Sequence, residues 1–586
     1  MRYPLLNELN TSRDMVDAFG GYNHNLRIGN GEFYDMKNLS SDGYPVLTQR
    51  HKRGVYASVK SPGGLIAKDA LCYVDGSDFV INGYPVHMGL TPGDKTLISM
   101  GAYVIIMPDK MWVKTISQSG DNGTFDYGYI EASFVSDSDV TFAPCTLDGN
   151  EINPSSGAEP PQDPANLSYW VDTSSSSYVL KQYSADSKVW LPVASPYVKV
   201  HAIGIGDLFD LYDGVRISGV KSPSLSGLNT TMPIWGKGEN YIIVVGVLDK
   251  AVTQSVSEGA IHISREMPEL DFIVESGNRL WGCRYGFDNN NNVVNEIYAS
   301  KLGDFKNWNC FMGLSTDSYT ASVGTDGVFT GAITHMGYPL FFKENCVHKV
   351  YGNFPSNFQV QETALRGVQR GSHGSLAIVN EILYYKARHG VCAYDGSLPV
   401  DVSEAFGDER YSGAVGVAHG NKYYVSMSDS SGKSHLFVYD TTKGMWHKED
   451  ELKAKYFCSV DGELYCIEDG KSQITKILGS GVPTEGDVEW MAETGDLYLS
   501  SPDMKYISKL TVRMSMDVGA KVAFYVLYDR DTDWTHVATV HAHNLRSFSL
   551  PIRPLRCDHL KLRMEGKGGT RIYSITKTVE QGSDIS

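Results

Sequence analysis

The sequence predicts an all-β chain built on a β-propeller of about seven blades, with a β-rich insertion and a C-terminal β-sandwich. Helical periodicity is almost absent, and the one segment compatible with a short helix is 14–19. A strand motif recurs at about 40 residues, which is the length of one four-stranded propeller blade. Asp-Gly pairs near these strands favour hairpins, because Gly and its neighbour must tolerate positive φ in tight turns.

Each repeat consists of a turn, a strand of apolar and aromatic residues, and a second short strand after another turn. Seven copies can be placed, at 69–73, 101–106, 278–281, 337–342, 380–385, 420–425 and 461–466. A propeller removes its sheet edges by closing into a ring. We therefore expect residues 28–50 to complete the last blade.

Two interruptions of the repeat divide the chain. Between Tyr103 and Leu280 the period is broken, and strand-like alternation on both sides of a Pro-rich loop predicts a β-rich insertion at 118–265. After Ile477, short segments that alternate apolar and polar residues predict a C-terminal β-sandwich at 485–586. The N-terminal strand and the first blades would then occupy 1–117, and the remaining blades 266–484.

Composition excludes several classes of protein. No apolar run approaches the roughly 18 residues that span a bilayer, so no membrane span is expected, and the polar N-terminus predicts synthesis in the cytosol. A net charge of −16 argues against a surface that wraps nucleic acid. We interpret the basic cluster 50–53 as a solvated turn, with a phosphate contact as the alternative.

The nine cysteines contain no C-x-x-C pair and are interpreted as reduced core residues.

Two acidic loops are candidate calcium sites. Asp529, Asp531 and Asp533 have the D-x-D-x-D spacing, but Trp534 stands where a calcium loop needs Gly and no suitable Glu follows. A polar hairpin tip is the favoured interpretation. Asp288 and the four asparagines after it fail the same test and are interpreted as an exposed turn.

The remaining candidates for chemistry are carboxylates near turns and one short mixed stretch. Glycosidases need two carboxylates across the scissile bond, and the acidic residues near blade turns offer no evident pair: Glu344, Glu381, Asp395, Glu404 and Asp440. The stretch 556–559 holds a Cys, an Asp and a His in a row, but adjacent strand residues point to opposite faces and do not converge on a metal ion. The sequence therefore predicts no catalytic residue, no metal ligand, no cofactor and no enzyme.

A family resemblance suggests a function. Segments 19–25, 31–39 and 44–50 resemble the opening of bacteriophage tail proteins of the packaged-DNA stabilisation and tail-nozzle type, and 279–282, 297–300 and 303–308 look like a blade of that group. The resemblance implies a structural virion protein, made in the host cytoplasm, that forms a ring around the DNA exit channel, retains packaged DNA and helps its ejection. Implied partners are further copies in a cyclic homo-oligomer, neighbouring tail, portal or adaptor proteins, and DNA that passes without sequence-specific contact.

The alternative function is a carbohydrate-binding or glycan-degrading tail or receptor-binding protein, with a host-surface glycan as partner. Trp490, Tyr498 and Trp534 would then stack on sugar rings. Packing in the core explains these aromatic residues equally well.

Overall fold

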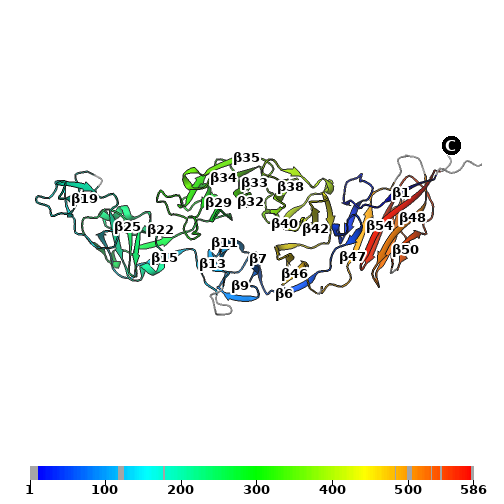
Figure 1. Ribbon diagram of the computed structural model, residues 1–586, viewed down its shortest axis with the longest axis horizontal. Helices are drawn as coiled ribbons and strands as arrows, with labels where there is room; N and C mark the ends of the chain where they lie inside the picture. Colours follow the sequence, from blue (N-terminus) through cyan, green and yellow to red (C-terminus); the bar gives the residue numbers. More distant parts are fainter. Residues whose placement is uncertain are drawn as a thin grey trace, which may run out of the picture. The chain divides into compact units, whose positions relative to one another are not determined.

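A computed structural model describes residues 11–116, 125–175, 178–481, 483–497, 505–529, 531–541 and 544–581. Strands dominate, as predicted, and the one α-helix of this part of the chain is α1 (Ile205–Leu208) (Figure 1). The expected helix at 14–19 is wrong. Residues 11–16 form β1 (Thr11–Val16), because they pair along their whole length with β54 (Thr570–Gln581). No helix among the described residues is long and apolar enough to cross a membrane.

The chain divides into two compact units, which are described separately. Unit 1 comprises Met1–Asp94, Phe342–Val347 and Ala364–Ser586, and unit 2 comprises Lys95–Phe341 and His348–Thr363. Both contain propeller blades, in which four short strands follow one another in a meander.

Unit 1 contains four such blades. Their strands are β7 (Pro62–Lys68), β8 (Ala70–Asp75), β9 (Asp78–Ile81) and β10 (Tyr84–His87); β36 (Ala377–Val379), β37 (Ile382–Ala387), β38 (Gly390–Tyr394) and β39 (Val400–Asp401); β40 (Ser412–His419), β41 (Lys422–Ser428), β42 (Ser434–Asp440) and β43 (Met445–Lys448); and β44 (Ala454–Val460), β45 (Glu463–Glu468) and β46 (Gln473–Leu478) with β6 (Gly54–Ser58). Asp461 and Gly462 have positive φ in the turn between β44 and β45, as the Asp-Gly signal predicted.

Unit 2 contains two more blades. The strands of a further blade include residues that are assigned to unit 1 and residues that are assigned to unit 2. The strands are β11 (Thr96–Met100), β12 (Tyr103–Met107), β13 (Met111–Lys114) and β14 (Tyr127–Tyr129); β28 (Phe272–Ser276), β29 (Arg279–Phe287), β30 (Val293–Ala299) and β31 (Tyr319–Ser322); and β32 (Gly331–His335), β33 (Tyr338–Lys343), β34 (Cys346–Tyr351) and β35 (Gln359–Ala364). The predicted class, an all-β chain with a β-propeller, is confirmed. Closure of these sheets into one ring of seven stays a prediction.

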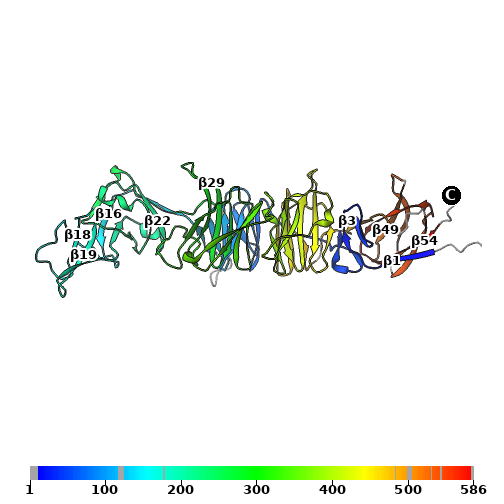
Figure 2. The same cartoon turned by 90° about the horizontal axis from the view of Figure 1, so that it is seen from above.

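The strand that completes the last blade differs from the prediction. Residues 28–50 do not pair with it; β6 does, with Ser58 opposite Gln473 and Gly54 opposite Lys476. Residues 11–49 instead form β1 to β5 and join the C-terminal β-sandwich. The sandwich therefore contains both termini of the described chain, and Figures 1 and 2 show the blue N-terminal strands among the red C-terminal ones.

The sandwich has two sheets whose strands alternate buried and exposed residues. One sheet runs β4 (Leu39–Ser40), β5 (Leu47–Gln49), β54, β48 (Lys505–Met516) and β51 (Arg546–Leu550), with β1 beside β54 and β52 (Arg556–Cys557) beside β48. The other runs β2 (Gly21–Tyr22), β3 (Glu32–Lys37), β47 (Glu489–Thr494), β53 (Leu560–Lys567), β49 (Lys521–Tyr528) and β50 (Thr535–Val540), and β2 continues it into the blade strand β43. One hydrophobic core joins the two sheets.

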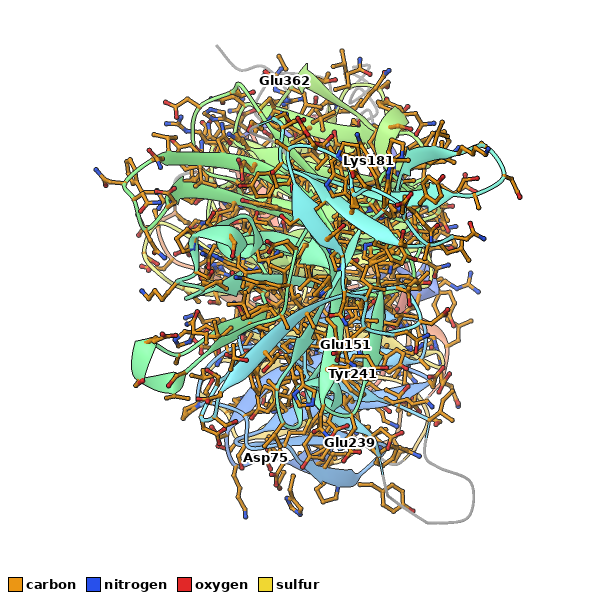
Figure 3. The ribbon with its side chains drawn as sticks, turned by 90° about the vertical axis from the view of Figure 1, so that its left-hand side faces the viewer. Asp75, Glu151, Lys181, Glu239, Tyr241 and Glu362 are labelled. Carbon is orange, nitrogen blue, oxygen red and sulfur yellow. The ribbon has the colours of Figure 1, made fainter. Side chains whose placement is uncertain are left out.

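The insertion lies between the second and third blades of the sequence, in unit 2. It contains three sheets: β15 (Ala132–Val135), β27 (His262–Arg265), β22 (Gly214–Ser218) and β23 (Thr231–Pro233); β24 (Gly236–Gly238), β25 (Tyr241–Val245), β21 (Tyr197–His201), β16 (Val140–Cys145) and β26 (Val252–Gln254); and β17 (Ser155–Gly157), β18 (Tyr169–Asp172), β19 (Val179–Ser184) and β20 (Val189–Pro192). Glu151 and Tyr241 lie close together in Figure 3, and Lys199 connects them, 3.3 Å from the Glu151 carboxylate and 4.6 Å from the centre of the Tyr241 ring.

All nine cysteines are buried and free, so their interpretation as reduced core residues is confirmed. Burial raises the pKa of the Cys72 thiol to about 12. A thiol held in this way is protonated at neutral pH and is a poor nucleophile.

Candidate functional site

The structure does not bring the aspartates of the candidate calcium loop together around an ion. The Asp529 carboxylate accepts a hydrogen bond from the backbone N–H of Asp558, and Asp531 and Asp533 are exposed. In the part of the chain that the structure describes, no group of three or more His, Cys, Asp or Glu side chains could hold a metal ion. Asp288 accepts hydrogen bonds from the N–H groups of Asn290 and Asn292, which makes the exposed turn that its sequence predicts.

The carboxylates near blade turns have separate local partners. Glu344 accepts a hydrogen bond from the backbone of Arg370, Asp395 caps its own turn at Ser397, and Glu404 lies in a short 3₁₀ segment. Glu381 has positive φ in a hairpin turn. Asp440 is different, because it lines a cavity that is described below.

The aromatic residues considered for sugar stacking do not form a platform. Trp490 is 3% exposed and belongs to the core of the sandwich. Trp534 is half-buried, and the Arg563 guanidinium covers its ring at 4.3 Å. Tyr498 lies outside the described residues. The alternation of the sandwich strands explains Trp490, since it takes a buried position of β47.

The basic cluster 50–53 is not the solvated turn that was predicted. Arg50 and Arg53 are buried, and acidic side chains distant in sequence neutralise them. Arg50 binds Glu485 through two hydrogen bonds of 2.8 Å, and Arg53 binds Glu449 at 2.6 Å and Asp450 at 2.7 Å. These partners come from 400 residues away, so local sequence could not reveal them.

A cavity of about 970 Å³ lies in unit 1. Its lining comes from the 3₁₀ segment Ser41–Gly43, linker residues 51 and 52, the start of β6, the turns before β41 and β45, the turn after β42, and the end of β46 with the loop after it. Its side chains include Asp42, His51, Lys52, Tyr56, His419, Asn421, Lys422, Asp440, Thr442, Lys443, Lys476 and Ser480. Such a volume is at the upper end of ordinary ligand sites, which occupy roughly 300–1,000 Å³.

The cavity has two carboxylates, each fixed by hydrogen bonds. Asp42 accepts from the Lys422 ammonium at 2.6 Å and from the Ser40 hydroxyl at 2.7 Å. Asp440 accepts from the Ser41 hydroxyl at 2.6 Å and from Thr442. Burial alone would raise the pKa of both carboxyls, but these hydrogen bonds outweigh it and hold both pKa values below the usual range. Both groups are therefore ionised at neutral pH.

Four lysines and two histidines also line the cavity. Lys422 is paired with Asp42, and Lys476 lies 2.9 Å from Glu463. Lys52 pairs at the surface with Asp487. Burial, and then repulsion by Lys422, lowers the pKa of His419, so this ring is neutral at pH 7.

One wall of the cavity is aromatic and accessible. Tyr56 is 42% exposed, and its ring packs edge-to-face with that of Tyr465 at 5.0 Å between ring centres. The Arg50 and Arg53 ion pairs fix the chain just before it. A second cavity of about 500 Å³ is lined by Arg53, Glu485, residues of β46 and the same first residues of β6. The first residues of β6 thus form a wall shared by two cavities.

No family model matches the chain, and no curated protein does. Solved structures resemble it at low similarity. An exo-β-1,3-galactanase from Phanerochaete chrysosporium is 10% identical over 52% of this chain and 95% of its own, with a TM-score of 0.21. PorZ, a surface component of the type-IX secretion system of Porphyromonas gingivalis, is 13% identical over 88% of this chain and 77% of its own, with a TM-score of 0.26. An engineered glycoside hydrolase of family 43 is 10% identical over 54% of this chain and 97% of its own, with a TM-score of 0.19.

These comparisons bear on two expectations. The solved structures are glycoside hydrolases and a secretion component rather than virion proteins, so they give no support to the expected role in a bacteriophage tail ring or to the expectation that the chain is not an enzyme. At these TM-scores, however, none of the chemistry of those proteins is transferred to this chain. The segments that carry the phage resemblance in 19–50 form sandwich strands and a 3₁₀ turn, and not a propeller blade. That resemblance, the expected partners and the virion location stay predictions.

Proposed function

We propose that the protein is a carbohydrate-active protein that binds oligosaccharide in the cavity between β6 and the turns of the neighbouring blade. The observation that carries this proposal is the composition of the cavity wall. An exposed aromatic face at Tyr56 lies in the same cavity as two ionised carboxylates, an amide and several ammonium groups.

A sugar ring requires both kinds of contact. Its C–H faces pack on aromatic rings, which offer an apolar surface with little loss of side-chain freedom. Its hydroxyls both donate and accept hydrogen bonds. Asp42 and Asp440 can accept from hydroxyls, and Lys422 and Asn421 can donate to them.

The cavity wall is also held in shape before any ligand arrives. Asp42 is fixed by Lys422 and Ser40, and Asp440 by Ser41. Groups fixed in this way lose less freedom on binding, which favours affinity. The same two carboxylates are the place where hydrolysis would be sought first, since glycoside cleavage uses a carboxylate pair.

The proposal is tested with the full chain on a glycan array, followed by calorimetry with the captured oligosaccharides. We expect Tyr56→Ala to weaken binding about tenfold, because the stacking surface is lost. The matched control is Tyr84→Ala, since Tyr84 is 53% exposed on β10 and outside the cavity. Thermal unfolding of both variants checks that the fold is kept.

Two results would contradict the proposal: capture of no glycan by the intact chain, or equal binding by the Tyr56→Ala variant. The same mixtures are assayed for new reducing ends. If these form, Asp440→Asn should abolish their release.

A further inference from the structure

The charge of the cavity wall points to the class of glycan. The chain carries a net charge of −16, whereas the cavity lining contains four lysines and only two aspartates. We infer that the ligand is an anionic oligosaccharide, one that bears carboxylate or sulfate groups. This inference rests on the proposed function.

The two aspartates do not neutralise the four lysines. Asp42 is already bound to Lys422 at 2.6 Å, with the lysine side chain 14% exposed and the carboxylate side chain 44% exposed. Asp440 is bound by the hydroxyls of Ser41 and Thr442 and by the backbone N–H of Lys443. Neither carboxylate makes an ion pair with Lys443.

Lys443 and Lys52 are the cations left for a ligand. Within the described residues, the Lys443 ammonium makes no ion pair and lies 5.5 Å from the centre of the Tyr44 ring. Lys52 pairs with Asp487, but both side chains are well exposed, and such surface pairs contribute little. An incoming anion can therefore exchange for Asp487. Lys476 stays bound to Glu463 and to the Ser480 carbonyl.

An anionic group that reaches these two lysines would make charge-assisted hydrogen bonds, which are about twice as strong as neutral ones. Tyr56 lines the same cavity and would hold the sugar ring. Tyr56 would thus contact the sugar ring, and Lys443 and Lys52 would bind its anionic group. A neutral glycan would leave the lysines solvated.

The experiment compares tetragalacturonate, its neutral methyl ester, a sulfated galactan tetrasaccharide and neutral galactotetraose by calorimetry with the intact protein. In 50 mM salt we expect at least one anionic ligand to bind tenfold or more tightly than its neutral counterpart, and to lose that advantage in 500 mM salt, where the Debye length is only about 4 Å. Lys443→Gln combined with Lys52→Gln should remove the preference. Lys60→Gln combined with Lys453→Gln, two exposed lysines outside the cavity, is the control for the same change in net charge.

The outcomes separate the two proposals. A preference for the galacturonate alone or for the sulfated ligand alone supports the inference and identifies the anionic group. Equal binding of charged and neutral glycans, unchanged in the double lysine variant, overturns the inference but leaves the proposed function standing. Binding of no glycan at all overturns both.

Discussion

At the scale of single residues, burial changes the protonation of His447. This residue lies in β43 with its ring buried, and its Nδ1 atom has no hydrogen-bond partner among the described residues. Burial, and then repulsion by Lys422, lowers the pKa of His447 to about 4. The folded protein therefore holds this ring neutral well below pH 7.

This depressed pKa makes a prediction about acid stability. In the unfolded chain a histidine takes up a proton near pH 6.5, so between pH 6.5 and 4 the unfolded state binds more protons and the folded state loses stability. We expect His447 alone to reduce the free energy of unfolding by about 2 kcal/mol between pH 7 and 4.5. His447→Gln should remove this part of the pH dependence, as measured by chemical unfolding at both values.

His389→Gln is the matched control, because His389 is exposed. Its pH dependence should equal that of the unchanged protein. An acid sensitivity in the His447→Gln variant as large as in the parent chain would show that the ring is not held neutral.

At the scale of elements, the short linker 50–53 joins the sandwich strands to the propeller strand β6. Its two arginines bind acidic groups on both sides, since Glu449 and Asp450 follow β43 whereas Glu485 precedes β47. Glu449 is buried, and burial raises its pKa even though Arg53 and Arg50 oppose the shift. The linker is thus fixed by ion pairs that depend on one another.

Removal of one partner from this network should be costly. Arg53→Met leaves the buried Glu449 carboxylate without its closest cation, and we expect a loss of about 3–5 kcal/mol in the free energy of unfolding. Adding Glu449→Gln should restore part of it, because the buried charge is then gone. Lys453→Gln, which breaks the exposed pair with Asp469, should cost less than about 1 kcal/mol. Equal losses for the buried and the exposed pair would contradict this account.

At the scale of the whole molecule, the two ends of the chain fold into one sandwich. β1 and β5 pair with β54, and β3 pairs with β47. The N-terminal residues therefore stabilise strands that are more than 400 positions away in sequence. The sandwich is incomplete until both ends are present.

This arrangement predicts a long-range effect of an N-terminal substitution. Phe33 is buried in β3, and Phe33→Ala should cost about 3–5 kcal/mol through the cavity it leaves. Hydrogen exchange should quicken in β47 and β53, because β3 pairs with β47 and β47 with β53. Met15→Ala, at an exposed position of β1, should change neither quantity. Unchanged exchange in β47 after Phe33→Ala would show that the C-terminal strands do not need the N-terminal ones.

Much of the architecture followed from local patterns. The 40-residue repeat predicted the blades, because each blade is a local meander whose strands and turns are encoded within one repeat. The Asp461-Gly462 turn illustrates this, since both residues have the positive φ that their types favour. The strand alternation of β48 and β49 likewise predicted sandwich strands with one buried face.

The sequence by itself determined the strand content, the blade meanders and the buried thiols, since these depend on residues close together in the chain. The tertiary structure decided the rest. It assigned 11–49 to the sandwich and β6 to the last blade, it buried Arg50 and Arg53 against distant carboxylates, and it brought Asp42, Tyr56 and Lys443 to one cavity. These features arise from strand pairing and ion pairs between segments about 400 residues or more apart. A local pattern of apolar and polar residues does not predict which distant segments come into contact.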